Sequence, residues 1–570
     1  MLKGIPIGVE DFKKIIETDC YYIDKTKFIE DILIDRTEVK LFCRPRRFGK
    51  TLNMNTLKYF FDIKNGEENR KLFNGLYIEN SPMIKEQGKY PVIFLSMKGI
   101  NGITFEESLN RIRKKISALY DEYKEILSDL DEFDSFFFKR YITENTDKSN
   151  LENSLKFLTK VLYNYYKEKV VLLIDEYDSP IISAYENGYY NEAINFFKGF
   201  YGDVLKTNEY LQMGVLTGIV RVAQAGIFSD LNNIENYTIL NKKYSQYFGL
   251  LEDEVKKALQ DYGISYKLEE VKAWYNGYRF GDSEVYNPLS ILKFLDTQEL
   301  GAYWINTSGN ALIKELLKNS DKTVFDTLNN LFNGKETVVY ISQSITLGNN
   351  LAPDDLWELL LFSGYLTVKE KIDMNTYFVR IPNSEIMTFF KKLFVDIIFN
   401  GLGTISRLKI ALLTKNIDEI ISCLENLVLN AMSTYDVRNN EAQDSDKNLR
   451  LCLNNHNRSE ELSDYWKNPY QNLLAGFLHG LEGTYFSIPN FESGDGRPDI
   501  ILKPVAKNKP AYILELKRLK DRAVEKELEE ALNQIKVNRY DSLLKREGIT
   551  DITNIALVFD RKRVYHKIEK

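Results

Sequence analysis

The fold of the N-terminal part is decided by one stretch, Glu38-Val39-Lys40-Leu41-Phe42-Cys43 followed by Arg44-Pro45-Arg46-Arg47-Phe48-Gly49-Lys50-Thr51. The first six residues predict a short strand. The apolar residues that follow predict an amphipathic helix, at Leu52, Leu57, Phe60 and Phe61. Backbone N–H groups at a turn from strand to helix point toward an anion, and the helix N-terminus adds a favourable field. The sequence therefore predicts that Gly49-Lys50-Thr51 binds phosphate.

A second motif lies on a later strand, where the apolar run Val170–Ile174 ends in Asp175 and Glu176. In P-loop ATPases a carboxylate at such a strand tip holds Mg²⁺, and the next Glu polarises the attacking water. Lys50 would reach the β- and γ-phosphates, and the Thr51 hydroxyl would hold Mg²⁺. Because both motifs follow strands in the expected order, they jointly predict a site for ATP and Mg²⁺.

The turn departs from the standard pattern Gly-x-x-x-x-Gly-Lys-[Ser/Thr] at its first position, which is Arg44. Pro45 removes one backbone donor, and Arg44 would be strained if the turn requires a positive φ there. Arg46 and Arg47 add positive charge that compensates for the lost donor or binds phosphate directly. The alternative is an ordinary basic turn whose Lys50 is solvated.

Another strand is predicted at Leu211–Gly218, and it ends in Thr217 with Arg221 just beyond. A polar residue at a neighbouring strand tip can sense the γ-phosphate, and an arginine can stabilise the transferring charge in cis or in trans. An edge threonine and a surface arginine explain the same residues equally well, so both interpretations stay open.

Apolar runs bounded by helices predict a buried parallel sheet, with strands that include Pro91–Ser96, Val170–Ile174 and Leu211–Gly218. We therefore expect residues 1–240 to form one α/β domain. Residues 241–345 are expected to be mainly helical.

A helix at Leu356–Leu361, a hairpin of Gly364–Val368 with Tyr377–Ile381, and a helix from Ser384 together have the outline of a winged helix. We expect residues 346–435 to form this winged-helix-like and helical region. Residues 436–464 are polar and nearly devoid of long apolar side chains, which predicts a linker or exposed loop. Residues 465–570 are expected to form a last α/β module. Its strands are predicted at Tyr485–Ile488, Asp499–Leu502, Tyr512–Leu516 and Ile555–Phe559, and a charged helix at Ala523–Tyr540.

The chain has 570 residues and a net charge of −6, with the charge spread unevenly. Residues 501–570 hold 17 Lys and Arg against 11 Asp and Glu, so this end is basic. A basic module on an acidic body suits a polyanionic partner, although a solvated basic helix explains it too. The sequence shows no apolar run of membrane-spanning length and no export signal, so we expect a cytoplasmic protein with reduced cysteines and no membrane partner.

The last module holds a second cluster of charged residues on two adjacent predicted strands. Fifteen residues separate Asp499 from Glu515, enough for a hairpin, and Glu515 and Lys517 share one face of a strand. Two carboxylates converging there would bind Mg²⁺ or Mn²⁺. The metal would polarise a phosphodiester and activate water, while Lys517 orients the nucleophile or neutralises charge. The alternative is a surface hairpin with a Lys–carboxylate pair of little energetic value.

The sequence resembles the bacterial AAA-ATPase-like proteins that carry a C-terminal PD-(D/E)xK nuclease domain. The resemblance covers almost the whole chain, and its most specific string is the basic turn itself. It rests on Ile5-Pro6-Ile7-Gly8, Tyr22-Ile23-Asp24-Lys25-Thr26, Arg44–Thr51, Trp274-Tyr275-Asn276-Gly277-Tyr278, Tyr286-Asn287-Pro288, Gly496-Arg497-Pro498-Asp499 and Glu515-Leu516-Lys517.

This resemblance implies a P-loop ATPase fold, a helical and winged-helix-like middle and a restriction-endonuclease-like core. It implies ATP with Mg²⁺ at Lys50, Thr51 and Asp175. It also implies a nuclease signature, with Gln534 as a supporting residue beside Asp499, Glu515 and Lys517. An arginine at position 44 is typical of the family.

One departure from the family lies ahead of the nuclease signature. Many members begin this domain with Glu-x-x-Tyr-His, whereas this chain has Lys467-Asn468-Pro469-Tyr470-Gln471. If the missing Glu supports the metal, activity is reduced.

We expect an ATP-binding and ATP-hydrolysing protein with a metal-dependent nuclease domain that acts on DNA in preference to RNA, as a monomer or homo-oligomer. One alternative is a nucleotide-dependent switch or scaffold whose last module binds nucleic acid or protein without cutting. Another is an ATPase regulator whose winged-helix-like segment reads DNA.

Overall fold

The computed structural model describes the chain in several ranges. They are residues 2–220, 232–304, 334–342, 353–388, 402–431, 483–489, 493–519, 523–560 and 563–569, with single positions at 228, 313, 324, 327, 328, 330, 331, 390, 474, 477, 478 and 481. The chain divides into two compact units, Met1–Phe389 and Phe390–Lys570.

The first unit is built on a five-stranded parallel sheet in the order β2-β3-β4-β1-β5. The strands are β1 (Val39–Cys43), β2 (Val92–Ser96), β3 (Val170–Asp175), β4 (Leu211–Gly218) and β5 (Ile234–Tyr237). Every residue of β1 and β3 is buried, as expected for strands covered on both faces. The predicted parallel sheet is thereby confirmed. Its edge strand β5 was not predicted, because its four residues carry no apolar run.

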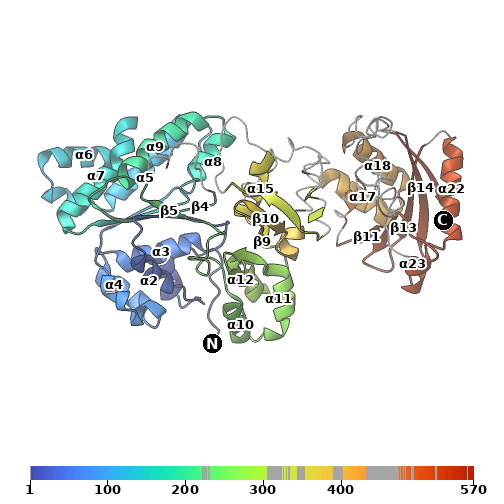
Figure 1. Ribbon diagram of the computed structural model, residues 1–570, viewed down its shortest axis with the longest axis horizontal. Helices are drawn as coiled ribbons and strands as arrows, with labels where there is room; N and C mark the ends of the chain where they lie inside the picture. Colours follow the sequence, from blue (N-terminus) through green and yellow to red (C-terminus); the bar gives the residue numbers. More distant parts are fainter. Residues whose placement is uncertain are drawn as a thin grey trace. The chain divides into compact units, whose positions relative to one another are not determined.

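Helices cover both faces of this sheet (Figure 1). One face carries α2 (Lys27–Ile34), α3 (Lys50–Phe61) and α4 (Gly66–Arg70), with the short α1 (Phe12–Glu17) packed against α3. The other carries α5 (Phe105–Asp121), α6 (Glu132–Ile142), α7 (Lys148–Tyr166), α8 (Ser179–Glu186) and α9 (Tyr190–Leu205). Because all five strands are parallel, their C-terminal ends lie at one edge of the sheet.

A helical region follows the sheet within the first unit. It contains α10 (Glu252–Asp261), α11 (Leu268–Tyr275) and α12 (Pro288–Thr297), with a two-stranded hairpin of β6 (Tyr278–Phe280) and β7 (Ser283–Val285). The Tyr286-Asn287-Pro288 motif starts α12: the Asn287 side chain accepts a hydrogen bond from the Ser290 N–H, and Pro288 occupies the first turn. Ile5, Tyr21 and Ile23 from the N-terminal segment pack against this helical core.

Residues 337–388 contain the expected order of helix, hairpin and helix, and we refer to them as the winged-helix-like segment. Its helix α15 (Pro353–Phe362) precedes the hairpin of β9 (Thr367–Lys371) and β10 (Thr376–Arg380), and a helical turn begins at Ser384. Asp373 closes the hairpin turn by accepting hydrogen bonds from the N–H groups of Asn375 and Thr376. An additional strand, β8 (Thr337–Tyr340), pairs with β10.

The second unit is a five-stranded mixed sheet in the order β11-β12-β13-β14-β15, in which only β13 and β14 run parallel. The strands are β11 (Tyr485–Pro489), β12 (Ile500–Pro504), β13 (Ala511–Arg518), β14 (Ile552–Asp560) and β15 (Arg563–Glu569). One face packs on α17 (Leu402–Thr414) and α18 (Ile417–Ala431), and the other on α22 (Val524–Val537) and the short α23 (Ser542–Arg546). The strand β15 follows the strand that we expected to close the module.

The region expected at 346–435 is divided between the two units. Its winged-helix-like segment belongs to the first unit, whereas α17 and α18 belong to the second. The reason is apolar packing: Leu412 and Leu424 lie in one buried cluster with Tyr512 of β13, and the Tyr512 hydroxyl donates to the Leu412 carbonyl at 2.6 Å. The predicted linker 436–464, Arg221, Cys452 and Lys467–Gln471 lie outside the described residues.

Two further observations bear on the character of the chain. Within the described ranges, Cys20, Cys43 and Cys423 form no disulfide with one another. Among the helices in those ranges, none combines the length and the apolar character that a membrane crossing requires.

Two candidate sites at the sheet edges

The first candidate site begins with the turn between β1 and α3. Two residues of this turn have left-handed backbone conformations, Arg47 with φ +67° and Gly49 with φ +80°. Gly49 is the N-cap residue of α3. Glycine adopts this conformation without strain, while Arg47 does so at some cost. The Arg47 side chain is exposed and that of Arg46 is half-buried.

Arg44 has a structural role under this turn. It is fully buried, and its Nη1 donates to the carbonyls of Cys43 (2.9 Å) and Tyr237 (2.6 Å). Its guanidinium lies over the rings of Phe248 and Phe280, 4.9 and 5.6 Å from their centroids. Burial lowers the pKa of Arg44 to about 9. The left-handed strain considered for Arg44 falls on Arg47 instead.

Lys50, the first residue of α3, is buried inside the turn. Its Nζ donates to the carbonyls of Arg44 (3.0 Å) and Pro45 (2.9 Å). Burial lowers the pKa of Lys50, and the nearby carboxylates, first among them Asp175, oppose this effect. The ammonium group is therefore held between the turn and the acidic ends of the strands.

Asp175 accepts hydrogen bonds from hydroxyl groups on two elements, α3 and β4. Its Oδ2 accepts from the Thr51 hydroxyl at 2.8 Å, and its Oδ1 accepts from the Thr217 hydroxyl at 2.5 Å. These contacts follow from the strand order, since β4 lies between β1 and β3 and so places Thr217 between the turn and Asp175. Thr217 also accepts from the Glu176 N–H at 3.3 Å.

Two further carboxylates follow Asp175 on the chain. Glu176 has φ +55°, and burial raises its pKa, with a smaller contribution from Asp175. Asp178 is buried and accepts from the N–H groups of Ile219 (2.7 Å) and Val220 (3.1 Å). It fixes the chain just before position 221. Asp178 was missed at the sequence level, because a carboxylate that anchors backbone amides carries no spacing signal.

The second candidate site lies on the β12–β13 hairpin. Ile500 pairs with Leu514, so Asp499 and Glu515 are brought to neighbouring positions at one end of the pair. The Asp499 carboxylate accepts from the Leu516 N–H at 2.8 Å. Lys517 Nζ lies 3.5 Å from Glu515 Oε1 and donates to Gln534 Oε1 of α22 at 2.6 Å. The four residues predicted here therefore come together.

The loop leading into Asp499 is pinned to the end of α22. The Ser493 hydroxyl donates to the Tyr540 carbonyl at 2.6 Å, and the Tyr540 hydroxyl accepts from Gln534 Nε2 at 3.1 Å. Gly494 has φ +65°, and a Cβ there would lie 2.1 Å from the Asn538 carbonyl oxygen. The fold thus needs glycine at this point to place Asp499. Tyr540 connects both halves of the site, a contact that spacing alone did not reveal.

The electrostatics of this hairpin favour a cation. Burial raises the pKa of Asp499, and burial together with the charge of Asp499 raises the pKa of Glu515 to about 8. Glu515 is only 2% exposed, and its Oε2 is enclosed without a hydrogen-bond partner among the described residues. A divalent ion would supply that partner and offset the repulsion, so the two carboxylates fit Mg²⁺ or Mn²⁺. The described ranges hold no cluster of three or more Asp, Glu, His or Cys side chains suited to a metal.

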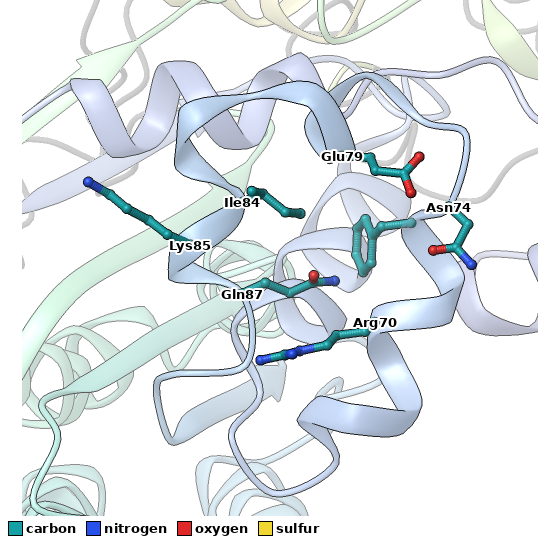
Figure 2. A pocket seen from close by; sticks show the side chains of 7 residues that line it. Arg70, Asn74, Glu79, Ile84, Lys85 and Gln87 are labelled. Carbon is teal, nitrogen blue, oxygen red and sulfur yellow. The ribbon is translucent and has the colours of Figure 1, made fainter.

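A separate cavity of about 380 Å³ lies beside α4, lined in part by Arg70, Phe73 and Gln87 (Figure 2). Lys85 also lines it but extends away from Gln87 and Ile84 in this view. The Gln87 Nε2 atom is buried and has no hydrogen-bond partner among the described residues. No predicted site residue lines this cavity, and we assign it no ligand.

Comparison with known proteins gives matches to family models and weaker likenesses to individual proteins. Over 391 residues the chain is 26% identical to a protein of Azotobacter chroococcum mcd 1 that is described as an uncharacterized protein in the vnfD 5′ region. This alignment covers 67% of this chain and 68% of that protein. A solved structure of the Aeropyrum pernix ORC2 protein, in ADPNP–ADP complexes, aligns with 11% identity and a TM-score of 0.22 over 65% of this chain and 92% of that one.

The family models match the two parts of the chain that hold the two candidate sites. Residues 6–228 match the family described as "Predicted AAA-ATPase", and residues 468–569 match the PD-(D/E)XK nuclease superfamily. The N-terminal part of the chain is therefore an AAA-ATPase-like domain, and its C-terminal part is a member of the PD-(D/E)XK nuclease superfamily.

Proposed function

We propose that the chain binds and hydrolyses ATP at the first site and cuts nucleic acid at the second. The observation that carries the first activity is the cluster in which Thr51 and Thr217 both donate to Asp175 beside the buried ammonium of Lys50. An ammonium, a hydroxyl and a carboxylate at the end of a parallel sheet are the groups that a triphosphate with Mg²⁺ requires.

Each residue of the first site has a distinct role in this proposal. Lys50 would bind the β- and γ-phosphates, and Thr51 with Asp175 would hold Mg²⁺, which would neutralise charge on the transferring phosphoryl group. Glu176 orients the attacking water and Thr217 senses the γ-phosphate. The basic side chains of the turn and beyond it, Arg46, Arg47 and Arg221, neutralise phosphate charge.

At the second site Asp499 and Glu515 would hold Mg²⁺ or Mn²⁺, which would polarise the phosphodiester and activate water. Lys517 neutralises developing negative charge on the phosphodiester, and Gln534 holds Lys517 in place through their 2.6 Å hydrogen bond. The substrate is DNA in preference to RNA. ATP binding gates or positions the nuclease.

The nucleotide site is tested by calorimetric titration of the full chain with ATP and Mg²⁺. Lys50→Ala should abolish binding, because it removes the cation that faces the phosphates. Lys71→Ala removes an equal charge from an exposed position and serves as the matched control. Equal affinity of the Lys50→Ala chain and the parent would refute the site.

The nuclease site is tested by incubating plasmid and single-stranded DNA with the full chain, with and without ATP and Mg²⁺ or Mn²⁺. Asp499→Asn should remove metal-dependent cleavage without unfolding the chain. Asp495→Asn changes an exposed carboxylate four residues away and should cut like the parent. Cleavage by the Asp499→Asn chain at the parental rate would exclude the proposed metal site.

A second candidate function is a nucleotide-dependent switch or scaffold whose C-terminal unit binds nucleic acid without cutting it. The observation that favours it is the small acidic set: the described part of the second site offers only Asp499 and Glu515 as carboxylates, and the chain has Lys467 where many family members carry Glu. DNA binding by the parent chain without cleavage in either metal would favour this alternative.

A further inference from the structure

The turn between β1 and α3, residues 44–49, is in direct contact with residues much later in the first unit. The Trp304 indole Nε1 donates to the Arg46 carbonyl at 3.0 Å. The Trp304 ring packs edge-on against Tyr365, with centroids 5.2 Å apart, in the bend between α15 and β9. In the same bend Gly364 approaches so closely that a Cβ there would lie 3.0 Å from Pro45 Cβ. The turn therefore rests on the winged-helix-like segment.

A buried carboxylate fixes Trp304 in this position. Glu385, at the start of the helical turn after the hairpin, is completely buried. Its Oε1 accepts from the backbone N–H groups of Tyr303 (2.6 Å) and Trp304 (2.8 Å), and its Oε2 accepts from the Ser290 hydroxyl (2.8 Å). These contacts join α12, the Trp304 backbone and the winged-helix-like segment.

The same turn carries the groups that nucleotide binding would change. Lys50 Nζ donates to the carbonyls of Arg44 and Pro45, and Arg46 is the next residue. A bound triphosphate competes with these carbonyls for the Lys50 ammonium. When Lys50 releases the Arg44 and Pro45 carbonyls, their peptide units are free to move, and they adjoin the Arg46 carbonyl that Trp304 binds. Nucleotide binding at Lys50 and the Trp304–Arg46 hydrogen bond therefore influence each other.

We propose that Trp304 and Glu385 are positioning residues of the nucleotide site, and that through them nucleotide occupancy is linked to the winged-helix-like segment. This rests on the proposed binding of ATP at Lys50. Thermodynamic linkage makes the effect reciprocal. A change that stabilises the Trp304–Arg46 contact in the nucleotide-bound chain raises the affinity for nucleotide, and bound nucleotide stabilises that contact to the same extent.

The first test follows tryptophan emission while ATP and Mg²⁺ are added to the full chain. The chain has four tryptophans, so single substitutions separate their signals. Nucleotide should change the emission of the parent and of the Trp274→Phe control, and the change should disappear in Trp304→Phe. An unchanged signal in a parent chain that binds ATP by calorimetry, or a signal that survives in Trp304→Phe, would overturn the inference.

The second test separates positioning from folding by measuring nucleotide affinity. Trp304→Phe removes the hydrogen bond to the Arg46 carbonyl, and Glu385→Ala frees the Trp304 backbone that presents it. Loss of that one contact to the turn predicts that each variant weakens nucleotide binding by roughly 3- to 10-fold. Glu385→Gln should restore affinity, because its amide oxygen still accepts from both N–H groups and its NH₂ can donate to the Ser290 hydroxyl. Parental affinity in Trp304→Phe and Glu385→Ala would refute the positioning role. A parent chain that binds no ATP would instead refute the proposed nucleotide site, and the link with it.

Discussion

Asp175 shows how single atoms carry the first site. Both of its oxygens accept from threonine hydroxyls, one on the helix after the turn and one on the neighbouring strand. A carboxylate held this way is fixed in orientation before any ion arrives, and preorganised groups of this kind cost no reorganisation during reaction. In the proposed function Thr51 holds the ion itself, whereas Thr217 orients Asp175 and senses the γ-phosphate.

We therefore expect Thr217→Ala to affect hydrolysis more than binding. Removing the hydroxyl leaves Asp175 Oδ1 without its 2.5 Å partner, and loss of a hydrogen bond to a charged group predicts a fall in kcat of roughly 10- to 100-fold. ATP affinity should change by less than about 3-fold, since Lys50 and Thr51 remain. Thr217→Ser keeps the hydroxyl and is the matched control. Phosphate release and calorimetry measure the two quantities, and an equal loss in both would speak against this role.

Glu385 predicts a pH-dependent stability. Burial raises its pKa from 4.5 to about 7, so the folded chain binds this proton more tightly than the unfolded chain does. The contribution of Glu385 to the free energy of unfolding is complete below pH 4.5 and is lost as the pH rises to about 7. Glu385→Gln cannot lose a proton. Its stability relative to the parent should rise between pH 5 and pH 8 by roughly 1–3 kcal/mol.

Urea unfolding of both chains at several pH values measures this difference. A difference that does not vary with pH would show that Glu385 does not titrate in this range.

At the scale of elements, the Trp274–Tyr278 motif joins the helical region to the winged-helix-like segment. The Asn276 carbonyl accepts from Asn383 Nδ2 at 2.8 Å. Tyr278 begins β6, and the centroid of its ring lies 4.9 Å from that of Phe48 in the turn between β1 and α3. The motif is thus the end of α11, a tight bend and the start of a strand.

Gly277 is the point in this bend where no other residue fits. It has φ +95°, and a Cβ would lie 2.1 Å from the Pro382 carbonyl oxygen. Gly277→Ala should therefore lower the free energy of unfolding by roughly 2–4 kcal/mol. Gly202→Ala in α9, where a Cβ meets nothing within 4 Å, should instead raise it by roughly 0.5–1 kcal/mol. Urea unfolding followed by tryptophan emission distinguishes them, and equal effects would contradict the steric argument.

At the scale of the whole molecule, the two sites lie in different compact units. A ligand that binds only the folded form stabilises its own unit, by about 2.7 kcal/mol at a hundred times its dissociation constant. ATP with Mg²⁺ should therefore raise the unfolding transition of the first unit, and Mn²⁺ alone that of the second. Scanning calorimetry of the full chain measures both shifts.

Lys50→Ala should remove only the nucleotide effect and Glu515→Gln only the Mn²⁺ effect. If either substitution abolished both shifts, the two units would not bind their ligands independently.

Local patterns were sufficient for much of the fold. The buried strands β1, β3 and β4 and the β9–β10 and β12–β13 hairpins were predicted, because apolar runs and turn residues act over a few neighbouring positions. The residues of both sites were named from spacing, except Gln534, which the family resemblance implied. The structure brings Lys50, Thr51, Asp175 and Thr217 together, as it does Asp499, Glu515, Lys517 and Gln534.

Only the tertiary structure decided what depends on distant parts of the chain. The strand order places β4 between β1 and β3, α17 and α18 pack on the second unit, and Trp304 contacts a turn that lies 258 residues earlier. Burial of Arg44 and the raised pKa of Glu515 are likewise properties of packing. No local pattern encodes them, because each arises where apolar surfaces or charges from separate elements are removed from water together.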